Sequence, residues 1–221
     1  MSTRDILPTA RAVIFDMDGV LVDTEPLHLL AANRVLAPCG VQITDEENSA
    51  FLGWTEAAFW QAIVARFGLP DDPAQYQAKR AECFLDLVRE GPRVVPGVRA
   101  VLEALRARGT RLAVASSSDA RVIRQVLSSG SLAEYFDVIA AGDEVSRSKP
   151  DPEIFLLASE RLGIAPPECL VFEDSPNGIR AALAAGMRCV RVLTAVTRHL
   201  PAPATGLVID TFENFDPAAF S

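Results

Sequence analysis

Residues 12–24 read AVIFDMDGVLVDT, and this stretch decides the fold. Residues 12–15 are apolar and mostly β-forming, so they predict a buried strand that opens into a loop at Asp16. Ligands of open parallel sheets bind beyond the carboxyl ends of the strands, where Asp16 and Asp18 would project toward the same side. Two neighbouring buried carboxylates need a cation, and Mg²⁺ is the usual partner of an all-oxygen site. An ordinary solvated turn is the alternative, since Asp and Gly are common loop residues.

Beyond residue 92, apolar strand-like runs alternate with amphipathic segments of about ten or more residues. The predicted strands are 111–116, 137–141, 169–174, 188–193 and 207–210, and the predicted helices are 98–109, 119–127, 152–162 and 175–186. Such alternation predicts right-handed βαβ units and a parallel sheet that is covered by helices on both faces. We therefore expect an α/β fold with a Rossmann-like core.

Residues 24–92 interrupt the alternation once, directly after the first strand, and contain no convincing strand pattern. They predict an α-helical cap domain, inserted into a discontinuous core domain made of residues 1–23 and 93–221. The predicted helices of the cap are 26–37, one that starts at the N-cap Thr44 with Glu47 three residues later, 55–68 and 73–91.

The composition limits the classes of function. The chain has 221 residues, of which 49% are hydrophobic, and this is enough for a sizeable core with one insert. The formal charge is −8 and Lys and Arg form no run, which argues against nucleic acid or an anionic membrane as a partner. The 4 cysteines lie far apart without a CxxC pair, which favours reduced thiols over disulfides or zinc. With no apolar signal core and no apolar span of ~18 residues, we expect a cytoplasmic monomer whose partner is a small molecule.

Polar residues recur where the predicted strands stop. Each position belongs at the carboxyl edge of the same sheet. Helix capping could explain any one of these residues, but it explains their joint occurrence at three strand ends less well. Lys149 adds a cation in a loop where Pro150 restrains the preceding residue to extended geometry, although a single lysine is commonly a solvated surface residue. The strand-end residues are Asp16, Asp18, Ser116, Ser117, Ser118, Glu173, Asp174 and Ser175.

These residue types permit phosphoryl transfer. Asp16 is a candidate carboxylate nucleophile toward phosphorus, which would form an aspartyl-phosphate. The charge of the phosphoryl group must then be masked. Mg²⁺ held by Asp16 and Asp174, with Lys149 and the Ser116 hydroxyl on the phosphoryl oxygens, would mask it. Asp18 could protonate the departing alkoxide and later deprotonate the attacking water, provided that its side chain stays off the metal.

The string DMDGV at 16–20, Ser116, Lys149 and the pair Glu173 and Asp174 resemble the four motifs of the haloacid dehalogenase superfamily, in order and in spacing. The longer strings DMDGVLVDTE, SKPDPEIF and EDSPNGI are similar to the subgroup with a helical cap after the first motif. That subgroup includes β-phosphoglucomutases and many sugar-phosphate phosphatases. The resemblance covers nearly the whole chain.

The resemblance implies a role for each matched residue. Asp16 would be the nucleophile, and Asp18 the acid and base that also binds Mg²⁺ through its backbone carbonyl. Dehalogenases of the superfamily lack an aspartate at the position of Asp18, so its presence points to phosphoryl transfer. The metal ligands implied are Asp16, Asp18, Glu173 and Asp174, and the phosphoryl or substrate binders are Ser116, Ser117 and Lys149.

Residues of the cap and of the segment after Ser116 distinguish a phosphatase from a mutase. Phosphoglucomutases resemble this chain at His28 and at the pair Lys79 and Arg80 on a cap helix. They carry an arginine that grips the distal phosphate where Glu56 stands, and a lysine and an asparagine where Asp119 and Ala120 stand. A mutase must hold a bisphosphate intermediate by both ends, so two anionic residues would repel the second phosphate. The departures favour a Mg²⁺-dependent phosphatase of a small phosphorylated metabolite, a sugar or polyol phosphate. A β-phosphoglucomutase-like phosphotransferase is the alternative, and a non-catalytic sensor of phosphorylated ligands is a third hypothesis.

The remaining cap candidates each have a second interpretation. Trp54 follows Gly53 in a loop, which makes it the better candidate for substrate contact, whereas Phe59 at helical spacing is expected in the core of the cap. His28 on an apolar helix face could be a packed, hydrogen-bonded histidine. Lys79 could be one charge on a solvated face.

Overall fold

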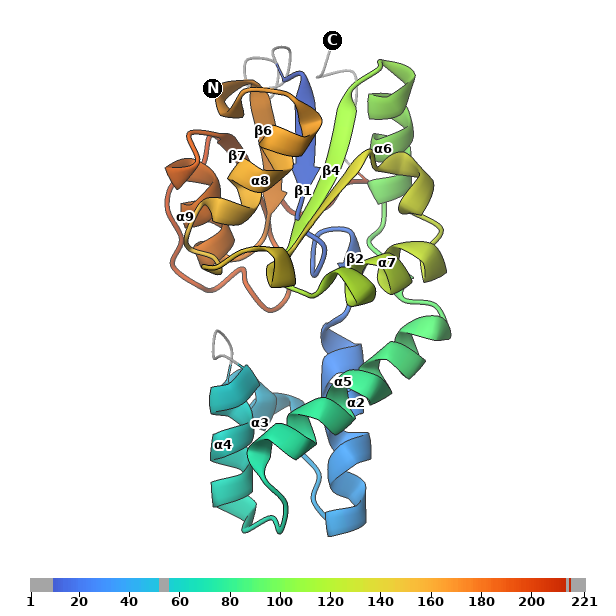
Figure 1. Ribbon diagram of the computed structural model, residues 1–221, viewed down its shortest axis with the longest axis vertical. Helices are drawn as coiled ribbons and strands as arrows, with labels where there is room; N and C mark the ends of the chain where they lie inside the picture. The colour runs from blue at the N-terminus through green and yellow to red at the C-terminus, as the bar shows by residue number, and fades with distance from the viewer. Residues whose placement is uncertain (1–9, 52–55, 214, 216–221) are drawn as a thin grey trace. The chain divides into compact units, whose positions relative to one another are not determined.

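The chain divides into two compact units (Figure 1). Met1–Asp23 and Arg93–Ser221 form the first, which we call the core domain, and Thr24–Pro92 forms the second, which we call the cap domain. The computed structural model describes residues 10–51, 56–213 and 215.

A six-stranded sheet forms the centre of the core domain. Its strands are β1 (Ala12–Phe15), β4 (Arg111–Ser116), β5 (Val138–Ala141), β6 (Cys169–Glu173), β7 (Arg188–Val192) and β8 (Leu207–Ile209). Their order is β5-β4-β1-β6-β7-β8, and every neighbouring pair is parallel. Phe15 of β1 pairs with Val114 on one side and with Phe172 on the other. The carboxyl ends of all these strands therefore lie at one edge, which confirms the predicted α/β fold.

Helices and aromatic rings cover the two faces of the sheet. The helices of the core domain are α6 (Val98–Ala107), α7 (Ala120–Ser129), α8 (Glu153–Leu162) and α9 (Pro176–Ala184), with short 3₁₀ turns at η2 (Ala133–Tyr135), η3 (Gly142–Glu144) and η4 (Pro166–Glu168). On one face, Ile14 and Val171 belong to a buried cluster that includes side chains of α8 and α9. Because side chains alternate along a strand, Phe15 and Phe172 lie on the other face. Their rings stack 5.0 Å apart, and Phe212 packs against Phe172.

Side chains near the ends of the elements set their boundaries. The helix α9 begins after Ser175, whose hydroxyl accepts a hydrogen bond from the Gly178 amide at 3.0 Å, as an N-cap should. The strand β5 begins at Val138, one residue later than predicted. At this boundary the Asp137 amide donates to the Leu112 carbonyl at 2.8 Å, and the Asp137 carboxylate accepts a hydrogen bond from the Leu112 amide at 2.9 Å.

A short antiparallel ribbon stands apart from the main sheet. It consists of β2 (Val22–Asp23) and β3 (Arg93–Val94), and Asp23 pairs with Arg93. The loop before β2 turns at Gly19, whose φ of +77° is in the left-handed region that favours glycine. Strands of two residues have no alternation to detect, so the sequence did not predict this ribbon.

The described elements of the cap domain are helices. Its elements are α2 (Glu25–Leu36), the 3₁₀ turn η1 (Ala37–Cys39), α3 (Asp45–Ser49), α4 (Glu56–Phe67) and α5 (Pro73–Arg89). Its buried core contains Trp60 and Tyr76, whose rings stack 5.7 Å apart, and Phe59 packs against this core as expected. The predicted N-cap of α3 is confirmed: the Thr44 hydroxyl accepts a hydrogen bond from the Glu47 amide, and the Glu47 carboxylate accepts one from the Thr44 amide.

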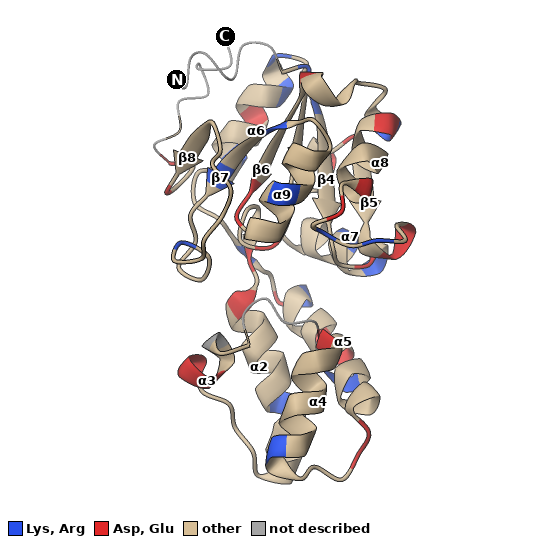
Figure 2. Ribbon diagram, turned by 90° about the vertical axis from the view of Figure 1, so that its left-hand side faces the viewer, with Lys and Arg blue, Asp and Glu red and all other residues tan. Residues whose placement is uncertain are grey.

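Charged residues and cysteines are dispersed over the fold. Figure 2 shows Lys and Arg distributed singly over elements of both domains. Cys39, Cys83, Cys169 and Cys189 are free thiols, and the last two are buried in the sheet, as the sequence predicted. None of the helices in the described part of the chain combines the length and the apolar character that a bilayer crossing requires.

Candidate active site

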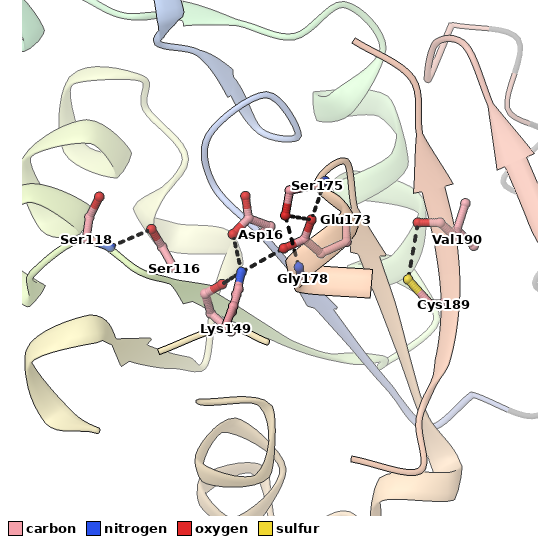
Figure 3. A network of polar contacts seen from close by, with 10 residues as sticks. Asp16, Ser116, Ser118, Lys149, Glu173, Ser175, Gly178, Cys189 and Val190 are labelled. Carbon is pink, nitrogen blue, oxygen red and sulfur yellow. Dashed lines mark hydrogen bonds and ion pairs between the residues drawn. The ribbon is translucent and has the colours of Figure 1, made fainter. Parts of the chain in front are cut away.

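Several of the predicted strand-end residues lie together in the core domain, and Figure 3 shows Asp16, Ser116 and Glu173 among them. Asp16 follows β1, Ser116 ends β4, and Glu173 ends β6 with Asp174 directly after it. Because β1 lies between β4 and β6, the parallel register brings these side chains to adjacent positions at one edge of the sheet. All four are buried, although each is polar or charged.

Lys149 connects the nucleophile candidate with the end of β6. Its Nζ atom lies 2.5 Å from Asp16 Oδ1 and 2.8 Å from Glu173 Oε1. It also donates to the backbone carbonyl of Ala115 at 3.1 Å. Three acceptors thus match the three donors of the ammonium group, which is the condition for burying a lysine. Lys149 is therefore buried beside Asp16 and Glu173 and is not a solvated surface lysine.

The loop that carries Lys149 is held by the first residue of α8. The Glu153 carboxylate accepts hydrogen bonds from the Ser146 amide and the Arg147 amide, both at 3.0 Å, and from the Ser146 hydroxyl at 2.9 Å. A carboxylate at a helix N-terminus is also favoured by the helix dipole. The backbone before Lys149 is therefore tied to the start of α8.

The carboxylates of Asp16, Glu173 and Asp174 form a cluster in which each offers an oxygen within 4.8 Å of the others. Burial raises the pKa of Asp16 well above its usual value, against the attraction of Lys149. Burial, and then the charge of Glu173, raises the pKa of Asp174 to about 7. Burial disfavours the charge of Lys149, but Asp16 and Glu173 hold its pKa above the usual value. Three carboxylates face one ammonium, so this set of hard oxygen donors lacks positive charge and fits a divalent cation such as Mg²⁺.

Asp18 lies beside this cluster without joining it. It is partly exposed in the loop after β1, and its backbone forms a bridge with Val22. Its carboxylate is not one of the three clustered metal donors found among the described residues. Burial is the largest cause of the raised pKa of Asp16 and of Asp174. The negative charge of Asp18 is a smaller cause that raises both pKa values further. An acid close to the nucleophile but outside the donor cluster is suited to proton transfer.

The serines at the end of β4 and directly after it pack against Gly142, which follows β5. The Ser116 hydroxyl is buried and accepts a hydrogen bond from the Ser118 amide at 3.2 Å, whereas Ser117 is exposed. The Gly142 amide donates to the Ser118 carbonyl at 2.8 Å. A Cβ atom on Gly142 would lie 2.0 Å from the Ser117 carbonyl oxygen, so this close approach requires glycine.

In the cap domain, His28 belongs to a polar and aromatic network. Its ring stacks on Phe84 with the centroids 4.2 Å apart, and its Nδ1 atom contacts the Arg80 guanidinium. Arg80 also forms an ion pair with Glu56. Burial, together with the charge of Arg80, lowers the pKa of His28 to about 3, so its ring is neutral at neutral pH.

The other two predicted cap residues are Lys79 and Trp54. Lys79 Nζ is 2.8 Å from Asp71 Oδ2 and lies over the Tyr76 ring at 5.4 Å, so Lys79 is not the cation that contacts His28. Trp54 lies outside the described residues.

A protein-family model described as haloacid dehalogenase-like hydrolase matches residues 13–192, which is most of the chain. The chain belongs to this family. The matched span of this haloacid dehalogenase-like hydrolase includes Asp16, Ser116, Lys149 and Asp174, and the resemblance inferred from the motifs is confirmed.

This haloacid dehalogenase-like hydrolase aligns over most of its length with two curated phosphatases and with a solved structure. The chain is 38% identical over 180 residues to the phosphorylated carbohydrates phosphatase of Thermotoga maritima, covering 80% of this chain and 82% of the relative. It is 35% identical over 180 residues to the fructose-1-phosphate phosphatase YqaB of Escherichia coli, covering 81% and 95%. The crystal structure of CbbY from Rhodobacter sphaeroides in complex with phosphate superposes with a TM-score of 0.81 at 33% identity, covering 93% of this chain and 96% of CbbY.

Two features near the cluster were not predicted for this hydrolase. The hydroxyls of Thr194 and Thr197 lie beside Asp174, in a segment too irregular for pattern analysis. In α9, a Cβ atom on Gly178 would lie 1.5 Å from Glu173 Oε1, so the glutamate occupies the space that a side chain would fill. A glycine inside a predicted helix is the signal that could have revealed the second feature.

Proposed function

We propose that the chain is a Mg²⁺-dependent phosphatase that hydrolyses a small phosphorylated metabolite, a sugar or polyol phosphate, through an aspartyl-phosphate. The observation that carries the proposal is the buried cluster in which Asp16 contacts Lys149 beside the carboxylates of Glu173 and Asp174. The family and the names of its phosphatase relatives support the same reaction.

The reaction consists of two displacements at phosphorus. In the first, a carboxylate oxygen of Asp16 attacks phosphorus, the bond to the ester oxygen breaks, and Asp18 donates a proton to the departing alkoxide. In the second, Asp18 takes a proton from water as the water oxygen attacks the same phosphorus. This releases inorganic phosphate and regenerates the Asp16 carboxylate. Lys149 and the Ser116 hydroxyl bind the phosphoryl oxygens throughout.

The cation supplies what the chain lacks. Asp16 and Asp174 would hold Mg²⁺, with Glu173 and the backbone carbonyl of Asp18 completing the set. Bound there, it would neutralise the negative charge that the phosphoryl group brings to the site. Lys149 alone leaves an excess of carboxylates, so an anionic substrate would otherwise be repelled.

Charged residues of the cap domain and of the segment after β4 support a phosphatase over a mutase. Arg80 is already ion-paired with Glu56 and contacts His28, so its charge is balanced within the cap domain. Asp119, at the N-cap of α7, is exposed and anionic. A bisphosphate intermediate needs cations for its second phosphate, and these residues disfavour it. We infer that the cap, including Trp54, selects a monophosphorylated substrate.

A panel of phosphate esters tests the proposal. The purified protein is incubated with Mg²⁺ and sugar, polyol and nucleoside monophosphates, and released phosphate is measured alongside the sugar product. We expect Mg²⁺-dependent release that EDTA abolishes and that is highest with a sugar or polyol phosphate. Isomerisation of β-glucose 1-phosphate without phosphate release would establish the mutase alternative instead. Tight binding of a phosphorylated ligand without turnover would establish a sensor.

A further inference from the structure

The segment that follows β7 packs against Asp174. The Thr197 hydroxyl donates to Asp174 Oδ2 at 3.2 Å, and the Thr194 hydroxyl lies 3.5 Å from the same oxygen. The two threonine hydroxyls are 2.7 Å apart. Thr197 is 7% exposed although it is polar, so its hydroxyl is committed to these contacts.

The threonine pair is itself held in place. The Thr197 amide donates to the Thr194 hydroxyl at 3.0 Å, which closes a tight local turn. From β7, the Arg191 guanidinium donates to the carbonyls of Thr197 and Leu200, both at 3.0 Å. The segment is therefore anchored to the sheet from which Asp174 also comes.

The loop after β1 meets the same point from another direction. A Cβ atom on Gly19 would lie 2.8 Å from Asp174 Oδ2 and 3.2 Å from Thr194 Cγ2. This oxygen of Asp174 is thus enclosed by Gly19, Thr194 and Thr197. An oxygen enclosed in this way cannot exchange places with its partner by rotation of the carboxylate unless the surrounding contacts break.

We propose that Thr197 is a positioning residue for the metal site: it fixes Asp174 through Oδ2 and thereby commits the other oxygen, Oδ1, to the divalent cation. This inference rests on the proposed function, because it concerns the affinity of the same cluster for Mg²⁺. Outer partners of metal ligands orient those ligands, and their loss typically lowers metal affinity about 10- to 100-fold. A threonine that only ties down the segment would change stability and leave metal affinity unaltered.

Thr197→Val tests the role, because it replaces the hydroxyl by a methyl group of similar size. Binding of Mn²⁺ to the metal-free protein is measured by calorimetry or by electron paramagnetic resonance, without substrate. We expect the dissociation constant to rise about 10-fold or more. The half-saturating Mg²⁺ concentration for phosphate release should rise in parallel, while kcat at saturating Mg²⁺ stays within about 2-fold of the wild type because the reacting groups are unchanged.

Two control variants make the result specific. Thr197→Ser keeps the hydroxyl and should restore most of the affinity. Thr205→Val removes a hydroxyl that donates to the Leu207 carbonyl, at the edge strand β8, and should leave Mn²⁺ binding unchanged. If Thr197→Val does not fold, Thr194→Val removes the hydroxyl that contacts the Thr197 hydroxyl at 2.7 Å and orients it toward Asp174, and is expected to weaken Mn²⁺ binding several-fold.

The outcomes separate this inference from the function on which it rests. Wild-type affinity for Mn²⁺ in Thr197→Val, with or without a lower melting temperature, would overturn the positioning role alone. Failure of the wild-type protein to bind Mn²⁺ would refute the proposed metal site, and the inference with it. Equal weakening in Thr205→Val would show a general loss of stability and would also overturn the positioning role.

Discussion

A single added methyl group at Gly178 should disrupt the cluster. In Gly178→Ala the new Cβ would lie 1.5 Å from Glu173 Oε1 and 1.9 Å from Glu173 Cδ. Ordinary contact distances are about 3.5 Å, so the carboxylate must move by about 2 Å. Glu173 Oε1 lies 2.8 Å from Lys149 Nζ, and Oε2 lies 2.7 Å from the Ser175 amide nitrogen. A movement of this size breaks both contacts.

Two effects of opposite sign decide the stability of Gly178→Ala. Alanine inside a helix is favoured over glycine by about 1 kcal/mol, so helix propensity alone predicts a more stable protein. Breaking a buried ion pair costs about 3–5 kcal/mol, because a charge is left buried without its partner. We therefore expect the free energy of unfolding to fall by about 2–4 kcal/mol, and kcat/KM to fall because Lys149 loses one of its two carboxylate partners.

Urea unfolding followed by far-UV circular dichroism measures the change in stability. Asn177→Ala is the matched control, since it alters the preceding, exposed residue of α9 and should change stability by less than about 0.5 kcal/mol. A Gly178→Ala protein that is as stable as the wild type, or more stable, and has unchanged kcat/KM would refute the reasoning. Helix propensity would then have decided the outcome.

Asp16→Asn keeps the shape of the side chain and removes the nucleophile, so turnover of p-nitrophenyl phosphate should fall below detection; persistent turnover would contradict the covalent mechanism. Beryllium fluoride with Mg²⁺ should mimic the phosphoaspartate and inhibit phosphate release. Unaffected turnover at millimolar fluoride would count against the aspartyl-phosphate intermediate. Glu56→Gln leaves Arg80 without its carboxylate partner, so hydrolysis of a sugar bisphosphate should rise relative to hydrolysis of the monophosphate. An unchanged ratio of the two rates in a phosphate-release assay would show that Glu56 does not disfavour a second phosphate. The pKa of His28 is lowered from 6.5 to about 3, so as the pH falls below 6.5 the unfolded chain binds a proton at His28 before the folded chain does. The stability that the neutral, folded His28 contributes is therefore complete above pH 6.5 and is lost as the pH falls toward 3. Urea unfolding at pH 7 and pH 5 should therefore show a loss up to about 2 kcal/mol larger in the wild type than in His28→Gln, and equal losses would show that His28 is not held neutral.

The residues that the sequence predicts best are those whose signal is local. Asp16, Ser116 and Glu173 each end an apolar run, and parallel strands bring their ends to one edge whatever the order of the strands. Lys149 needed the family resemblance, because nothing in a single loop lysine distinguishes it from a surface residue. Its burial follows from the three acceptors that the fold supplies.

Other features depend on packing that no local pattern contains. Lys79 and Arg80 are adjacent in α5 and point about 100° apart, so the choice between them depends on how the helix is rotated against His28. The pairing of Thr197 with Asp174 joins segments 23 residues apart, and it arises only after the sheet has formed. Neither relation can be read from residue type or spacing.

The ribbon of β2 and β3 makes the cap domain a replaceable module. Asp23 and Arg93 are paired across it, so the polypeptide leaves the core domain and returns to it at neighbouring points. A two-residue hairpin turn can join such a pair, which means that Thr24–Pro92 can in principle be excised, or exchanged for the insert of a relative, by splicing at a single place. Selectivity could then diversify by recombination while the sheet edge that carries Asp16 and Lys149 is inherited unchanged.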